Sequence, residues 1–291
     1  MISVQLDWKP NAQFAGLLLA DHRGWFTDAG IDLSILPWQP ATDPVRDVGT
    51  RLGHVAVSED NLAISAAAAG VDIVILGSML RSSPLAWMVP QESGIETFAD
   101  FAGKTIGVHV DGVTGLDFAL RSAGLTTADA NVVDVPYDKV DQLLAGSIDV
   151  CQCHGLVEPA EMRAIGVDLR VLWARDVGYQ VYSQVISTSR ATIEADPDAI
   201  DRFVDVLWSG WRAVFESTSD AAAVIIDHYL DESNVAIQQE ILDTMRPWVF
   251  GEPGAEEMLG SIDPVRLQAS IDLLVANGVI DEPLRAENLL P

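Results

Sequence analysis

Near its start the chain reads LDWKPNAQFAG over residues 6–16, directly after a segment in which apolar and polar residues alternate. The alternation predicts a short strand over residues 2–6. Asn11 is a typical helix-capping residue, and the apolar run over residues 14–20 predicts the buried side of the next helix. In open α/β sheets the carboxyl end of a strand faces the ligand crevice, so we expect Trp8 and this helix start to share that crevice.

The alternation of strands and helices continues along the chain. Further strands are predicted over residues 31–36, 54–57, 73–76, 105–110, 132–135 and 169–172, and helices over residues 43–52, 62–69, 116–123, 140–144, 196–215, 220–229, 234–245 and 263–277. Residues 85–89 and 181–186 are predicted as two crossings between α/β lobes. The predicted fold is therefore an α/β structure of two lobes with a hinged cleft between them. One lobe takes residues 1–88 and 187–291, and the other takes residues 89–186.

The composition excludes several classes of partner. The 291 residues are 49% hydrophobic, enough for a large core, and carry a formal net charge of −26. Such a charge repels phosphate backbones and anionic membrane surfaces, so nucleic acid is not an expected partner. No apolar run approaches the roughly 20 residues that span a bilayer, so direct membrane insertion is not expected.

Two cysteines and a histidine lie close together in the sequence as Cys151-Gln152-Cys153-His154. A disulfide across one intervening residue would be strained. Paired zinc ligands are usually separated by two to four residues, and no second ligand pair lies nearby. We therefore expect no metal site, and we expect both cysteines to be buried as small apolar groups.

The order Asp-Trp-x-Pro-Asn-x-Gln-Phe-Ala-Gly is followed by Gly24-Trp25-Phe26, by the Ser58-Glu59 turn, by Arg81-Ser82-Ser83-Pro84 and by Glu158-Pro159. Taken together, the chain resembles the thiamine-pyrimidine-precursor family over nearly its whole length. The resemblance implies a type II periplasmic-binding-protein fold. Most members of that family are solute receptors of importers, and one branch is a pyrimidine synthase.

The resemblance also implies a ligand site. Trp8 would be the aromatic plate under an aminopyrimidine ring, and Glu158 would accept a hydrogen bond from its amino edge. The remaining candidates are Asn11, Phe14, Trp38, Ser58, Glu59, Ser83, Thr114 and Tyr182. Trp38 would enlarge the aromatic lining, and Thr114 opens a helix whose backbone N–H groups suit a polar ligand group. From the residues alone, core packing of Trp8, a solvated Glu158 and an ordinary turn before Thr114 stay open.

Two departures from the family pattern bear on function. Phe14 stands where pyrimidine binders commonly have a histidine, which keeps flavins and other heterocycles open as ligands. The synthase branch has a lysine aligned near Ser58, a histidine near Leu62 and a run of cysteines near residues 179–184, and none of them is present. A Schiff base needs that amine. We therefore expect a receptor that binds its solute without chemical change and needs no cofactor. The alternatives are a synthase-like enzyme on the same scaffold, or a receptor for a flavin or another small organic solute.

The resemblance implies a membrane permease of an ABC transporter as the protein partner. It also implies a periplasmic location or an extracellular, membrane-tethered one. The first residues show no basic stretch followed by an apolar one. The expectation is that an export signal precedes the sequence given, with a cytoplasmic location as the alternative.

Overall fold

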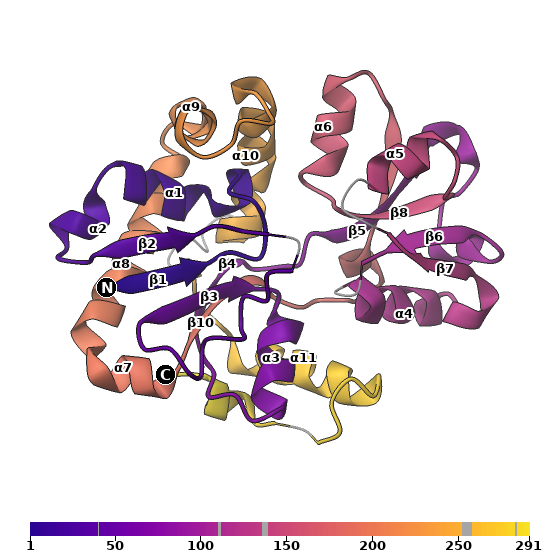
Figure 1. Cartoon of the computed structure of the whole chain (residues 1–291). Helices are drawn as coiled ribbons and strands as arrows, with labels where there is room; N and C mark the ends of the chain where they lie inside the picture. Colours follow the sequence, from indigo (N-terminus) through magenta and orange to yellow (C-terminus); the bar gives the residue numbers. More distant parts are fainter. Residues whose placement is uncertain (40, 110–111, 136–138, 252–257, 283) are drawn as a thin grey trace. The chain divides into compact units, whose positions relative to one another are not determined.

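The computed structural model describes the whole chain except residues 40, 110–111, 136–138, 252–257 and 283. The chain folds into two compact units (Figure 1). The first unit contains residues 1–81 and 181–291, and the second contains residues 82–180. Each unit has its own mixed sheet with helices against it. The α/β class predicted from the sequence is therefore confirmed, whereas the predicted lobe boundaries and the hinged cleft stay predictions.

The first unit is organised around a sheet with the strand order β2-β1-β3-β10-β4. Its strands are β1 (Ile2–Gln5), β2 (Leu33–Leu36), β3 (His54–Ser58), β4 (Val74–Leu80) and β10 (Ser183–Thr188). β1 is parallel to β2 and β3, while β10 is antiparallel to β3 and β4. The segment predicted as the returning crossing is thus mainly an inner strand of this sheet.

Helices lie on both sides of that sheet. They are α1 (Ala15–His22), α2 (Trp25–Asp28), α3 (Asp60–Ala68), α7 (Arg190–Ala195), α8 (Pro197–Val214), α9 (Thr218–His228), α10 (Val235–Phe250) and α11 (Pro264–Ala276), with short 3-10 turns η1 (Ala12–Phe14) and η8 (Ala286–Leu289). Figure 1 shows α1 and α9 on one side and α3 with α11 on the other. The predicted helices in the C-terminal third are confirmed.

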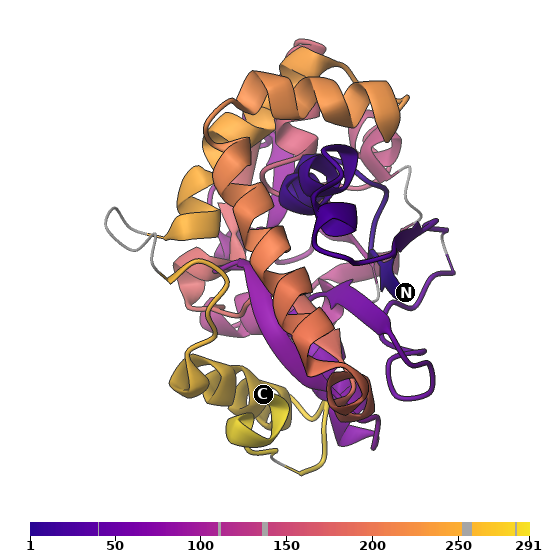
Figure 2. The ribbon, with the colours of Figure 1, turned by 90° about the vertical axis from the view of Figure 1, so that its left-hand side faces the viewer.

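The pairing of α1 with α8 depends on two glycines. A Cβ on Gly210 would lie 2.0 Å from the carbonyl oxygen of Gly16, and one on Gly16 would lie 2.4 Å from the ring of Trp211. Only glycine allows this approach without a shift of the helices. Trp211 is fully buried, so the aromatic residues of α8 pack in the core as expected (Figure 2 shows α8 crossing this unit).

The second unit has a sheet with the order β7-β6-β8-β5-β9. The strands are β5 (Leu85–Pro90), β6 (Thr105–Val108), β7 (Asn131–Asp134), β8 (Val150–His154) and β9 (Leu169–Trp173), and the helices are α4 (Val113–Ser122), α5 (Lys139–Leu144) and α6 (Glu158–Ala164). β6 is parallel to β7 and β8, and β5 is antiparallel to β8 and β9. Cys151 and Cys153 point from β8 into the core of this unit, as predicted.

One predicted helix is wrong. Residues 43–52 form a series of turns instead, with bonds such as Val48 N–H to Val45 O (3.3 Å) and Thr50 N–H to Asp47 O (3.3 Å). β-branched residues at 45, 48 and 50 and a glycine at 49 all disfavour a continuing helix. Within the described part of the chain, no helix has the length and apolar character needed to cross a membrane.

Candidate functional site

The carboxyl edge of the first unit's sheet gathers most of the predicted site residues. β1, β3 and β4 end at this edge, and β10 begins there, because Ser183 pairs with Leu80 and Val185 pairs with Ser58. The segments at that edge carry Trp8, Asn11, Phe14, Trp38, Ser58, Glu59 and Tyr182. Segments separated by more than a hundred residues therefore meet through strand pairing.

Two indoles lie side by side at this edge. β1 and β2 are parallel neighbours, with Gln5 opposite Leu36, so the segments that follow them run together. Trp8 follows β1 and Trp38 follows β2, and their ring centroids are 4.7 Å apart with an interplanar angle of 48°. Both side chains are half-buried. Part of each indole is therefore exposed, and an indole is a side chain on which a flat ring can stack.

Asn11 and Phe14 have clear structural roles. The Asn11 side-chain oxygen accepts a hydrogen bond from Gln13 N–H at 2.9 Å, so the predicted cap is confirmed, although it starts η1 and not α1 itself. Phe14 is fully buried. The contact of either side chain with a ligand stays a prediction.

Glu59 is connected to β10. Its carboxylate accepts a short hydrogen bond from the Ser183 hydroxyl, and the buried Ser58 hydroxyl donates to the Glu59 carbonyl oxygen at 3.1 Å. Glu59 is the N-cap residue of α3, but its side chain makes no capping hydrogen bond to that helix. A half-buried carboxylate is thus held beside the start of β10.

Tyr182 is held by three contacts with α3 and α11. Its N–H donates to the Asp60 carboxylate at 2.9 Å, its hydroxyl accepts from Asp263 N–H at 2.9 Å, and the Arg266 guanidinium lies 4.2 Å from its ring centre. Tyr182 and Asp60 are both fully buried. Burial raises the pKa of Asp60 to about 6, against the opposing effect of its hydrogen bond from Tyr182 N–H. Tyr182 is therefore a buried residue that packs behind the carboxyl edge of the sheet.

The second unit holds the other three candidates. The Glu158 carboxylate accepts from His154 N–H at 2.9 Å, which links the first residue of α6 to the end of β8. The Ser83 hydroxyl is buried and accepts from Leu85 N–H at 3.2 Å at the start of β5. Thr114 is half-buried in the first turn of α4. Asp111, in the predicted turn before α4, lies outside the described residues.

Three buried glutamines near these candidates were missed by sequence reasoning. Gln152 on β8 accepts from His109 N–H at 2.8 Å, and a Cβ on Gly112 would lie 2.1 Å from its amide oxygen. Gln13 on η1 and Gln184 on β10 join their amides across the first unit at 2.6 Å. The sequence shows each of these glutamines as a polar residue in a predicted apolar segment. It does not indicate their hydrogen-bond partners, because those depend on the fold.

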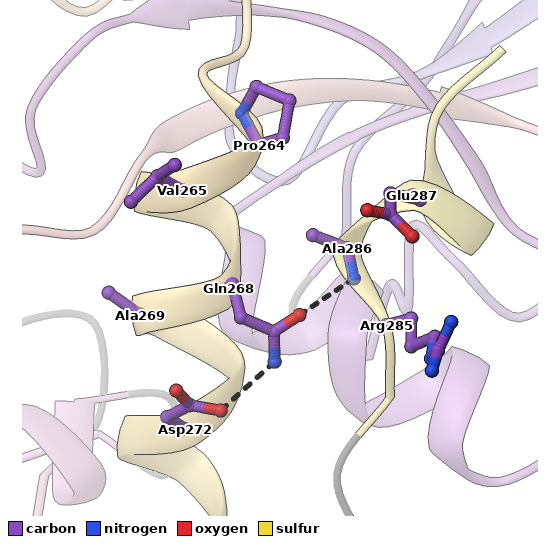
Figure 3. A pocket seen from close by; sticks show the side chains of 8 residues that line it. All are labelled: Pro264, Val265, Gln268, Ala269, Asp272, Arg285, Ala286 and Glu287. Carbon is purple, nitrogen blue, oxygen red and sulfur yellow. Dashed lines mark hydrogen bonds between the residues drawn. The ribbon is translucent and has the colours of Figure 1, made fainter.

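Two hollows in the described part of the first unit are lined by other residues. One, of about 660 Å³, is lined by α11 and η8, where Gln268 accepts from Ala286 N–H and donates to Asp272, both at 2.9 Å (Figure 3). The other, of about 310 Å³, is polar and lined by residues that include Gln5 and His54. Neither is lined by a predicted site residue. The described residues contain no group of three or more His, Cys, Asp or Glu that could hold a metal.

Comparison with known proteins assigns the family. The sequence profile described as NMT1/THI5 like matches residues 11–221, which is most of the chain. The chain belongs to this family. The match confirms the resemblance drawn from the opening motif and includes Asn11, Glu59 and Glu158.

Relatives of this NMT1/THI5-like chain include binding proteins and enzymes. It is 25% identical over 293 residues to a formylaminopyrimidine-binding protein of Halalkalibacterium halodurans, covering 99% of this chain and 88% of the relative. It is 22% identical over 298 residues to the riboflavin-binding protein RibY of Chloroflexus aurantiacus, covering 97% and 82%. A 4-amino-5-hydroxymethyl-2-methylpyrimidine phosphate synthase of Legionella pneumophila is 24% identical over 149 residues, covering 51% of this chain and 47% of the enzyme.

Solved structures confirm the fold. The periplasmic aliphatic sulphonate binding protein SsuA of Escherichia coli aligns with a TM-score of 0.76 at 18% identity, covering 100% of this chain and 91% of that one. A protein of Methylobacillus flagellatus, described as a putative sulfonate ABC transporter, periplasmic sulfonate-binding protein, aligns with a TM-score of 0.70 at 16% identity, covering 100% and 91%. The fold is that of periplasmic binding proteins.

Proposed function

We propose that this protein is a solute-binding receptor of an ABC importer. Its ligand is a small nitrogen heterocycle, such as a thiamine pyrimidine precursor, which it binds and releases unchanged. The observation that carries the proposal is the pair of half-buried indoles, Trp8 and Trp38, at the carboxyl edge of a sheet. A flat ring stacked on an indole gains about 0.5–1.5 kcal/mol beyond the burial of its area.

The chemistry of the neighbouring side chains supports a ring that carries hydrogen-bond donors. Glu59 is a half-buried carboxylate at the same edge, and Ser183 keeps its orientation. Glu158, the first residue of α6, is the corresponding candidate in the second unit, as a carboxylate that would accept from an amino group. The proposal includes the hinged cleft predicted from the sequence. Ligand binding would then favour a closed form through its higher affinity for that form.

Two relatives that match nearly the whole chain are named as binding proteins, and a third is named as a putative thiamine biosynthesis protein, whereas the synthase match extends over about half of the chain. We therefore include in the proposal a permease of an ABC transporter as partner and a periplasmic or membrane-tethered extracellular location. The synthase alternative needs an amine for pyridoxal phosphate, and the position aligned with that lysine is Ser58.

Thermal unfolding with a ligand panel tests the proposal. The panel contains 4-amino-5-hydroxymethyl-2-methylpyrimidine, riboflavin, an alkanesulfonate and pyridoxal phosphate. A ligand at 100 times its Kd adds about 2.7 kcal/mol to the free energy of unfolding. We expect the pyrimidine or the flavin to raise Tm. No shift with either would overturn the ligand class, and a Schiff-base absorbance band retained after gel filtration would favour the enzyme.

Tryptophan variants test the carrying observation. Trp8→Ala and Trp38→Ala should each weaken binding of the responding heterocycle by about tenfold, in keeping with the loss of ring contacts. Trp25→Ala is the matched control, because Trp25 is also half-buried but lies on α2, with Arg23 5.2 Å from its ring centre. Equal affinities for all three variants would contradict the proposed site.

A further inference from the structure

Gln184 is the second residue of β10 and has two unfavourable features. Its φ is 54°, and no other non-glycine residue in the described part of the chain has a positive φ. L side chains avoid this region because the Cβ crowds the following carbonyl oxygen. The residue is 2% exposed, and no hydrogen-bond donor among the described residues reaches its buried Oε1.

The position of the amide is fixed by its neighbours. Gln184 Nε2 donates to Gln13 Oε1 at 2.6 Å, and Gln13 N–H donates to the Asn11 cap at 2.9 Å. The preceding Ala12 N–H donates to Oε1 of Gln238, on α10, at 2.9 Å. The side-chain oxygens of Asn11, Gln13 and Gln238 therefore each accept a hydrogen bond. In this group of amides, only Gln184 Oε1 accepts none from the described residues.

The location of this acceptor is informative. Gln13 lies between Asn11 and Phe14, and Gln184 follows Ser183, whose hydroxyl donates to Glu59. The amide pair therefore joins the segment after β1 to the start of β10, at the carboxyl edge where the candidate residues gather.

We propose that Gln184 is a specificity-determining residue, whose Oε1 accepts a hydrogen bond from an amino or ring N–H group of the solute. This inference rests on the proposed function and narrows its ligand class. Residues that keep a rare backbone conformation and an unmet buried polar atom are concentrated at functional sites. A carbonyl oxygen accepts and does not donate, so it favours a donor-bearing heterocycle and disfavours a sulfonate or another anion.

The expected selectivity is large. A site built to hydrogen-bond a ligand group rejects an analogue that lacks this group far more strongly than an apolar pocket does. The test is isothermal titration of the full chain with 4-amino-5-hydroxymethyl-2-methylpyrimidine and with 5-hydroxymethyl-2-methylpyrimidine, which lacks the amino group. Riboflavin and its N3-methyl derivative form a second pair, in which the N3–H is the donor.

Wild type should prefer the donor-bearing member of a pair by about tenfold or more, equivalent to 1.4 kcal/mol. Gln184→Met keeps the length of the side chain and removes the amide, so this preference should fall to less than about threefold. Gln268→Met is the matched control. Gln268 lies on α11, where its amide binds Ala286 and Asp272 away from the candidate residues, so this variant should keep the wild-type preference.

Different failures are distinguishable. If wild type binds both members of each pair equally well, the inference about Gln184 is wrong but the receptor proposal still stands. The same holds if Gln184→Met keeps the wild-type preference. Wild type that binds none of the four compounds overturns the ligand class of the proposed function and this inference with it. The preference of wild type is measurable even if Gln184→Met does not fold.

Discussion

Substitution of Asp60 by asparagine should change the pH dependence of stability. Asp60 is fully buried, accepts from Tyr182 N–H at 2.9 Å, and has a pKa raised from 3.8 to about 6, chiefly by desolvation. Between these two pH values the folded chain keeps a proton that the unfolded chain has lost. The folded state then binds more protons, so this carboxyl makes the free energy of unfolding fall as pH rises from about 4 to 6.

The size of the effect follows from the shift. Two pKa units correspond to about 3 kcal/mol, because each unit contributes about 1.36 kcal/mol. The penalty is absent below pH 4 and complete above pH 6. In Asp60→Asn it is removed, while an amide oxygen at the same place still accepts from Tyr182 N–H.

Urea unfolding of wild type and Asp60→Asn at pH 4 and pH 7.5 measures this effect. The free energy of unfolding of Asp60→Asn, relative to wild type, should rise by about 3 kcal/mol from the lower pH to the higher. The difference between the two proteins cancels the titration of the other acidic residues. A relative stability that is the same at both pH values would refute the reasoning from burial.

Asp100 is the control with the opposite sign. It is exposed, and hydrogen bonds from Glu96 N–H, Thr97 N–H and the Thr97 hydroxyl lower its pKa. A lowered pKa stabilises the fold above the ordinary pKa, and this contribution is lost as pH falls through the folded value. Asp100→Asn should therefore lose stability relative to wild type at pH 7.5 and approach it in acid.

Two further substitutions test helix packing and a surface ion pair in the first unit. Gly210→Ala should lower the free energy of unfolding by about 2–3 kcal/mol, because its Cβ would lie 2.0 Å from the Gly16 carbonyl oxygen. Ser209→Ala is the control, because Ser209 is exposed on the same helix, and it should change the free energy of unfolding little. Equal urea midpoints for the two variants would contradict this packing argument. Lys9→Ala should change the free energy of unfolding by less than about 0.5 kcal/mol, because the 2.6 Å pair with Glu232 is exposed, and a larger loss would show that this pair matters.

Local signals in the sequence predicted much of the fold. Alternation gave the first strand, the cap at Asn11 is present, and the periodicity of residues 196–215 corresponds to α8. Asp43-Pro44-Val45 is a typical helix start and predicts a helix over residues 43–52, but the β-branched residues and Gly49 that follow favour the turns observed there. Pattern alone does not weigh backbone propensity in a short segment.

The candidate site could be predicted only as far as it is local. Trp8 was selected from its position after a strand, but its pairing with Trp38 depends on β1 and β2 being parallel neighbours. The contact of Gln13 with Gln184 joins residues 171 positions apart. The sequence shows such glutamines as polar residues in apolar surroundings and contains no signal for their partners, because tertiary packing determines them.

The central claim is that the chain binds a nitrogen heterocycle and leaves it unaltered. Native mass spectrometry of the full chain, incubated with 4-amino-5-hydroxymethyl-2-methylpyrimidine and riboflavin in competition, tests this most directly. The account predicts a complex of one chain with one heterocycle, from which the ligand is recovered at its original mass. A chain that retains neither compound, or that releases a ligand of changed mass, would contradict the account.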